Sequence, residues 1–226
     1  MSLDHVEIFF QVVVFLFAIS VHESAHAYVA WRCGDPTAYM LGRVTLNPIK
    51  HIDPFGTVIL PLILIVLHMP VFGWAKPTPV NPRNFKRIVR SDILTSIAGP
   101  ISNLLVAIAS VILLLVISKS GDQGSLIVKG IASGVLNDTG SALVPFVLLL
   151  YESMLINVLL AVFNCIPIPP LDGSHVIRHM LPAGALRMYD MVGSFGLILF
   201  FLLGGRIIGI MMSPFLQFFN SLLMRF

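Results

Sequence analysis

Long apolar runs dominate the chain, and most charged residues lie in the stretches between them. A helix rises about 1.5 Å per residue, so roughly 20 apolar residues cross a hydrocarbon core of about 30 Å. Three runs are long enough for this, namely residues 6–31, 93–117 and 143–163. We therefore expect one transmembrane helix in each range, and we expect no regular helix in the polar residues 118–141.

The remaining apolar stretches are less regular. Residues 55–70 reach only about 24 Å as a helix and contain an internal proline. Residues 73–82, which follow, are too rich in proline for a helix, so we expect them to be extended. The apolar tail at residues 192–223 contains Gly204-Gly205-Arg206 and Pro214, which indicates either one span plus an interfacial helix or two short spans.

Basic residues flank the run at 55–70 on both sides. Because Lys and Arg concentrate in cytoplasmic loops, a single crossing would place these two flanks on opposite faces of the membrane. We therefore expect a re-entrant hairpin, in which residues 55–70 enter the membrane and residues 73–82 return, buried against protein. Eight of the fourteen Lys and Arg lie between the first and second core helices: Arg32, Arg43, Lys50, Lys76, Arg83, Lys86, Arg87 and Arg90.

Composition supports a membrane location. Hydrophobic residues make up 57% of the chain and charged residues 11%, and the mean hydropathy is +0.92, whereas soluble domains carry about 25% charged residues. The basic residues lie between the apolar runs, where the preference of Lys and Arg for cytoplasmic loops accounts for them. The net charge of +3 therefore does not indicate a nucleic-acid partner, and we expect none. The predicted fold class is an all-α polytopic membrane protein with about 4–6 transmembrane helices and a re-entrant hydrophobic hairpin or extended segment between the first two core helices. We expect one membrane-embedded domain over residues 1–226, with a core at 6–175 and C-terminal helices at 188–224.

The polar residues inside the first predicted helix form a metal-binding pattern. His22 and His26 are four residues apart, so they share a helix face and can offer two nitrogens to one zinc ion, with Glu23 beside it. Charge inside a membrane is costly, and a carboxylate next to two histidines therefore indicates a functional site. The alternative is a polar cluster that lines a helix interface or a transport path.

Asp172 is the candidate for a third ligand. A catalytic zinc takes three protein ligands and keeps an open position for water. Asp172 follows the proline-stiffened residues 167–170 at the inner end of a span. If residues 55–82 form a re-entrant hairpin, the chain crosses the membrane outward through residues 93–117 and back through residues 143–163. Asp172 then lies on the same side of the membrane as the two histidines. Its alternative role is to cap a helix that starts near Ser174. We expect His175 and His51 to support the site from outside the ligand set or to be ordinary surface residues.

His22–His26 is followed along the chain by Ala98-Gly99-Pro100, Phe163-Asn164 and Leu171-Asp172-Gly173. These motifs in this order resemble the site-2 protease family of intramembrane zinc metalloproteases. The resemblance covers most of the chain, roughly residues 6–175. The chain departs from the family's shorter Asn-Pro form in having Cys165 directly after Asn164. Two further motifs resemble the compact prokaryotic branch of the family, which lacks PDZ and CBS domains. The two motifs that resemble this branch are Gly73-Trp74-Ala75-Lys76-Pro77 and Asn81-Pro82-Arg83-Asn84.

The resemblance implies one zinc ion per chain, bound by His22, His26 and Asp172, with Glu23 as the general base. Asn164 and Asn103 are candidates to hydrogen-bond the substrate backbone or the developing oxyanion, and helix-to-helix hydrogen bonding is the alternative for both. The two cysteines, far apart in the sequence, are predicted to be free thiols.

The implied substrate is a transmembrane protein segment, for example that of a membrane-tethered regulator, which must unwind before its peptide bond can be attacked. We expect the extended residues 73–82 to pair with the unwound substrate. The expected location is the prokaryotic cell membrane, with the active site near the cytoplasmic side and the lipid bilayer as surroundings. The alternative function is a metal-ion transporter or a metal-binding membrane protein without protease activity, although we find no internal repeat of the transporter kind.

Overall fold

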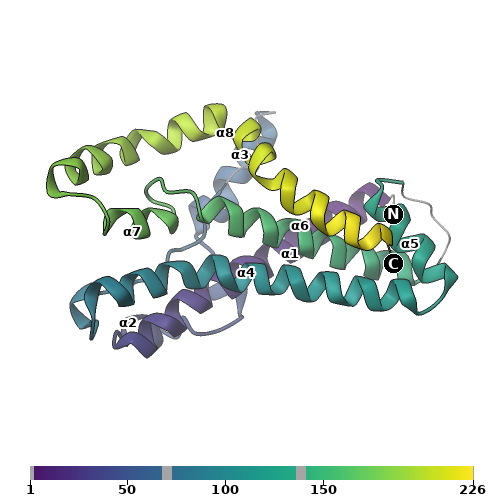
Figure 1. Ribbon diagram of the computed structural model, residues 1–226, viewed down its shortest axis with the longest axis horizontal. Helices are drawn as coiled ribbons and strands as arrows, with labels where there is room; N and C mark the ends of the chain where they lie inside the picture. Colours follow the sequence, from purple (N-terminus) through teal and green to yellow (C-terminus); the bar gives the residue numbers. More distant parts are fainter. Residues whose placement is uncertain (1–2, 68–72, 136–140, 226) are drawn as a thin grey trace. The chain divides into compact units, whose positions relative to one another are not determined.

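The protein is all-helical, as predicted. The computed structural model describes residues 3–67, 73–135 and 141–225, and within these ranges it contains helices and turns but no strand (Figure 1). Two compact units are present, one formed by Ile19–Gly99 and the other by Met1–Ala18 with Pro100–Phe226. The elements in chain order are α1 (Leu3–Cys33), α2 (Thr37–Met40), η1 (Pro48–Lys50), η2 (Pro54–Ile59), α3 (Leu60–Val66), η3 (Pro82–Asn84), α4 (Ile88–Lys119), α5 (Asp122–Ala132), α6 (Leu143–Asn164), α7 (Gly173–Arg178) and α8 (Ala183–Arg225).

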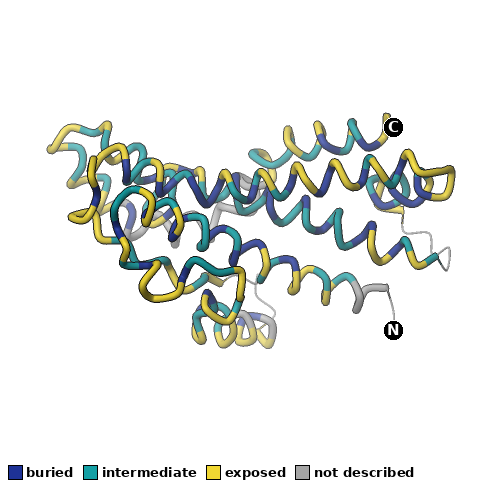
Figure 2. The backbone as a smooth tube through the Cα atoms, turned by 90° about the horizontal axis from the view of Figure 1, so that it is seen from below, coloured by how far each residue is buried: buried dark blue, intermediate teal, exposed yellow. Residues whose placement is uncertain are grey.

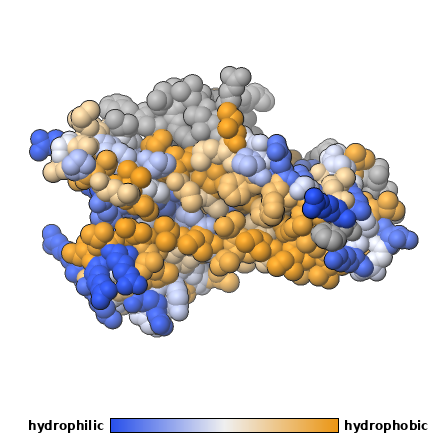
Figure 3. Space-filling model, in the orientation of Figure 1, coloured by the Kyte–Doolittle hydropathy of each residue, from blue (hydrophilic) through white to orange (hydrophobic). Residues whose placement is uncertain are grey.

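Three helices among the described residues are long and apolar enough to cross a membrane. They are Glu7–Cys33 within α1, Ile88–Lys119 and Leu143–Asn164, and they confirm the three long runs predicted from the sequence. In Figure 3 an apolar surface follows α4, where Leu105 and Ile112 are among the exposed side chains. Exposed apolar surface of this extent is suited to lipid rather than to water.

The core of the larger unit is built by α4, α5, α6 and α8. Leu114 of α4, Met154 of α6 and Leu223 of α8 are fully buried in one apolar cluster. Figure 2 shows buried and exposed positions alternating along the long helices, as expected for helices that bury one side only.

Helix α5 was missed by the sequence analysis, which predicted no regular helix there. Its Ile127, Val128 and Ile131 are buried in the core cluster, and their spacing is that of one helix face. The polar residues between them hide this pattern in a hydropathy average. A short amphipathic helix therefore covers the core where a polar connection was expected.

The smaller unit contains hydrogen bonds that agree with the predicted hairpin. The Trp74 N–H donates to the Gly56 carbonyl at 3.2 Å, and the Lys76 N–H donates to the His51 carbonyl at 2.9 Å. The Thr57 hydroxyl donates to the Trp74 carbonyl at 2.7 Å. The chain after residue 73 thus lies beside the start of the apolar run, and residues 68–72 lie outside the described part.

Helix α8 is longer and more regular than predicted. Its backbone is helical from Ala183 to Arg225, through both Gly204-Gly205-Arg206 and Pro214, where breaks were expected. A proline inside a helix removes one backbone hydrogen bond, and a long apolar helix can accept that loss without ending.

Candidate metal site

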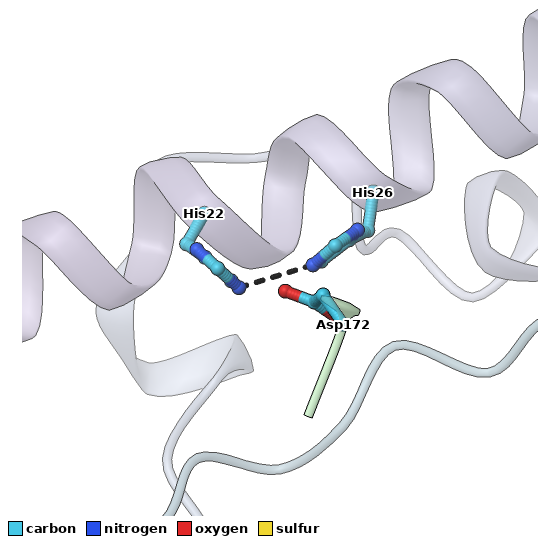
Figure 4. A group of neighbouring side chains, drawn as sticks. All are labelled: His22, His26 and Asp172. Carbon is cyan, nitrogen blue, oxygen red and sulfur yellow. Dashed lines mark hydrogen bonds between the residues drawn. The ribbon is translucent and has the colours of Figure 1, made fainter. Parts of the chain in front are cut away.

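His22 and His26 lie one turn apart on α1, as predicted, and both are buried with 7% of their surface exposed. Their Nε2 atoms face each other at 3.0 Å, the contact marked in Figure 4. Two nitrogens bound to one tetrahedral zinc at about 2.0–2.1 Å would lie roughly 3.3 Å apart. The observed pair therefore fits a zinc ion with only a small adjustment of the rings.

The backbone of α4 fixes the orientation of His26. Nδ1 of His26 lies 2.7 Å from the Thr95 carbonyl oxygen. A carbonyl can only accept, so Nδ1 carries the proton and donates it, which leaves the lone pair of Nε2 to bind a metal. Metal-binding histidines usually have such a partner on the other ring nitrogen.

Gly99 allows α4 to pass directly against the two imidazole rings. A Cβ atom at this position would lie 2.4 Å from Nε2 of His26 and 2.6 Å from Nε2 of His22. The sequence analysis used the Ala98-Gly99-Pro100 motif only through its family resemblance. The structure gives the physical reason for the glycine, because any side chain would occupy the space of the ligands.

The Glu23 side chain is held by a residue that the sequence analysis did not single out. The Thr78 backbone N–H donates to Oε2 of Glu23 at 2.8 Å, and the Thr78 hydroxyl donates to the Glu23 carbonyl at 3.0 Å. One feature of the sequence could have indicated Thr78. It lies between two prolines, which have no backbone N–H, so Thr78 supplies the one backbone N–H donor of residues 77–79.

Asp172 lies at the start of α7, in the larger unit, and its side chain makes no capping hydrogen bond there. A capping role is therefore not what the structure shows. Gly173 permits a close approach of the backbone, because a Cβ at this position would lie 2.3 Å from the Cys165 carbonyl oxygen. The preceding loop is also held by Tyr189, whose hydroxyl donates to the Pro167 carbonyl at 2.8 Å.

The two candidate asparagines make hydrogen bonds to helices. Asn103 is fully buried, and its amide donates to Oδ1 of Asn157 at 2.8 Å and to the Ala18 carbonyl at 3.1 Å. The amide of Asn164 donates to the Leu160 carbonyl of its own helix at 3.0 Å. The Asn103 contacts join different helices, as in the alternative, whereas the Asn164 contact lies within α6. The role of either residue toward substrate stays a prediction.

The remaining predicted residues have simpler roles. His51 is 1% exposed, and its Nε2 contacts the Thr45 carbonyl oxygen at 2.9 Å, so it is a buried residue at the base of the hairpin and not a surface residue. Cys33 and Cys165 are free thiols, as predicted.

Asp35 fastens the extended segment to the end of α1. It is fully buried, and it accepts hydrogen bonds from the Thr37 hydroxyl at 2.5 Å, the Asn81 N–H at 2.7 Å and the Asn84 amide at 2.8 Å. Burial acts to raise the pKa of the Asp35 carboxyl, but these hydrogen bonds outweigh it and hold the pKa below its usual value of 3.8.

We expect Asp35→Asn to remove a pH-dependent part of the stability. A lowered pKa stabilises the fold above the ordinary pKa, and that contribution disappears as the pH falls through the folded-state pKa. Replacing the charged acceptor costs about 1.5–3 kcal/mol for one hydrogen bond to a charged group. Thermal unfolding in detergent should therefore show a lower Tm for the variant at neutral pH, and the two proteins should converge in acid. An equal Tm difference at every pH would contradict this role for the Asp35 charge.

A membrane-spanning helix that carries His-Glu-x-x-His, with a glycine of the next long helix against its histidines, defines the class of membrane metalloproteases. The chain belongs to peptidase family M50, the site-2 protease family, whose family model matches residues 10–203. It is thus a zinc metalloendopeptidase with transmembrane helices.

Curated relatives carry the same description. The chain is 39% identical over 192 residues to the "Putative zinc metalloprotease YwhC" of Bacillus subtilis, covering 85% of this chain and 78% of that protein. It is 33% identical over 107 residues to the "Putative zinc metalloprotease Rip2" of Mycolicibacterium smegmatis, covering 47% of this chain and 40% of that protein. No solved structure matches the chain.

Proposed function

We propose that the protein cuts a peptide bond in or near a transmembrane segment of a membrane-protein substrate, with Glu23 as the general base. The observation that carries this proposal is the buried pair of histidines on an apolar helix, with their Nε2 atoms 3.0 Å apart and Glu23 next to them. A site so placed is open to substrates that arrive through lipid.

In this proposal His22, His26 and Asp172 bind one zinc ion. Figure 4 draws these three residues, and each offers one ligand atom. Two imidazole nitrogens and a carboxylate oxygen form a known donor set for catalytic zinc, which leaves a position for water. When bound, zinc lowers the pKa of its water to about 7.

The chain's own residues then move the proton. Glu23 accepts a proton as water attacks the peptide carbonyl, and it returns the proton to the leaving amine. Asn164 is half-buried at the end of α6 and is our first candidate to bond the oxyanion, with Asn103 as the second.

Residues 73–82 are proposed to contact the unwound substrate. They have no regular secondary structure before η3, which supports an extended partner. The N–H groups of Trp74, Lys76 and Thr78 all bond to the protein itself, and Pro77 and Pro79 have none. Within residues 74–79, these N–H groups are therefore used to hold the segment in place, and pairing with substrate would have to use other backbone groups of residues 73–82.

We further propose that the protein resides in the prokaryotic cell membrane with the site near the cytoplasmic face. The support is the cluster of Lys and Arg between the first two core helices. A membrane-tethered regulator is one substrate that would suit this location.

The proposed function is tested with purified protein in lipid vesicles and a fluorescent single-helix substrate. We expect one zinc ion per chain, cleavage inside or beside the helix, loss of cleavage with a chelator and recovery with added zinc. Zinc movement across the vesicle membrane without cleavage would instead support the transporter function.

A further inference from the structure

Residues 76–81 form a stiff segment beside the C-terminal half of α1. Pro77 and Pro79 fix their own backbone angles, and each proline also favours an extended conformation in the residue before it. Thr78 is consequently the one residue of 77–79 that has a backbone N–H. That N–H donates to Oε2 of Glu23.

We propose that Thr78 is a positioning residue that holds the Glu23 carboxylate in its working orientation. Glu23 has several rotatable bonds and is only half-buried, so burial alone does not fix its carboxylate. The backbone bond of 2.8 Å fixes one oxygen, and the hydroxyl bond of 3.0 Å ties the segment to the helix at the same residue. The other carboxylate oxygen, Oε1, is left to handle the proton.

Two buried charges hold Thr78 in place from the sides. Arg43 is 6% exposed, and its guanidinium donates to the Pro77 carbonyl at 3.4 Å and to the Lys50 carbonyl. The Pro77–Thr78 peptide group is therefore bonded at both ends, with its C=O to Arg43 and its N–H to Glu23. Three residues further on, the Asn81 N–H donates to Asp35 at 2.7 Å.

This arrangement predicts an effect on the chemical step and not on zinc binding. Thr78 has no role as a ligand, and its bonds end on Glu23. Displacing a catalytic group by about 1 Å can cost roughly 100-fold in rate. The inference rests on the proposed role of Glu23, so its test must include a Glu23 variant.

The test compares Thr78→Pro with Thr78→Ala in the vesicle assay. Thr78→Pro removes the N–H and keeps an extended backbone, whereas Thr78→Ala keeps the N–H and removes only the hydroxyl. We expect kcat to fall about 10- to 100-fold in Thr78→Pro and less than about fivefold in Thr78→Ala. The zinc content should stay at the wild-type value in both, and KM should change less than kcat, because Thr78 also lies in the segment proposed to contact the substrate. A Thr78→Pro protein that binds one zinc ion and has wild-type or higher kcat would overturn the proposal, and so would a change confined to KM.

Two further variants keep the test decisive. If Thr78→Pro fails to fold, Asn84→Ala is used instead, because it removes an exposed hydrogen-bond donor to Asp35 and so loosens residues 76–81. A severalfold fall in kcat of Asn84→Ala would support the proposal. An unchanged kcat would overturn it. Cleavage that survives Glu23→Gln would defeat the proposed function itself. An inactive Glu23→Gln together with a fully active Thr78→Pro would defeat only the role of Thr78.

Discussion

Glu23→Gln is expected to lower the rate of peptide-bond cleavage by about 10²- to 10⁴-fold, which is the usual contribution of a general base. Gln has the same shape but cannot accept the proton of the attacking water. Its side-chain oxygen can still accept the Thr78 N–H, so the contact at 2.8 Å is expected to survive. The variant should therefore fold and bind zinc like the wild type, and single-turnover cleavage of the helical substrate measures the loss.

Zinc content and Tm serve as the controls for Glu23→Gln. Both should match the wild type, because Glu23 is not among the proposed ligands. A variant that loses zinc as well would place Glu23 in the ligand set. A variant that keeps zinc and retains cleavage within about tenfold of the wild type would exclude Glu23 as the base.

The three long helices could be predicted from the sequence because each signal is local. Every residue of a run such as 143–163 contributes to one average hydropathy, and the same run appears as α6 at nearly the same bounds. The spacing of His22 and His26 is local too, since a helix places residues four apart on one face.

The parts that the sequence did not reveal depend on contacts between distant residues. Thr78 bonds to Glu23 across 55 positions, and Asn103 bonds to Asn157 across 54. A hydroxyl between two prolines and an amide inside a span are each compatible with several partners. Helix α5 was missed for a different reason. Ile127, Val128 and Ile131 form a short apolar face, but the hydropathy averaged over residues 118–141 also includes many polar residues and does not reveal that face.

The hairpin at residues 55–82 was predicted in part from the sequence, although it depends on contacts between residues that are not neighbours in the chain. Its existence was inferred from charge on both flanks of residues 55–70, a global argument about topology. The bonds from Trp74 and Lys76 back to Gly56 and His51 agree with it. A Cβ at Gly56 would lie 2.3 Å from the Trp74 indole nitrogen, so any larger residue would make the indole shift. No local sequence pattern around Gly56 predicts that contact.

Gly99→Ala is expected to abolish zinc binding and with it all cleavage. In an exposed helix position, the same change stabilises a protein by roughly 1 kcal/mol. At Gly99 the new methyl group would lie 2.4 Å from Nε2 of His26 and 2.6 Å from Nε2 of His22. Helix α4 must then move away or the rings must rotate, and either change separates the two nitrogens from a common ion. Zinc content per chain measures the loss directly.

The matched control is Gly209→Ala in α8, where an added Cβ meets nothing within 4 Å. This variant should keep one zinc ion per chain and wild-type cleavage, with an unchanged or slightly higher Tm. The comparison separates a blocked site from a general effect of alanine in a long helix. A Gly99→Ala protein with a full zinc content would show that the histidines bind no metal on the side facing α4, and the metal site would then have to be placed elsewhere on α1.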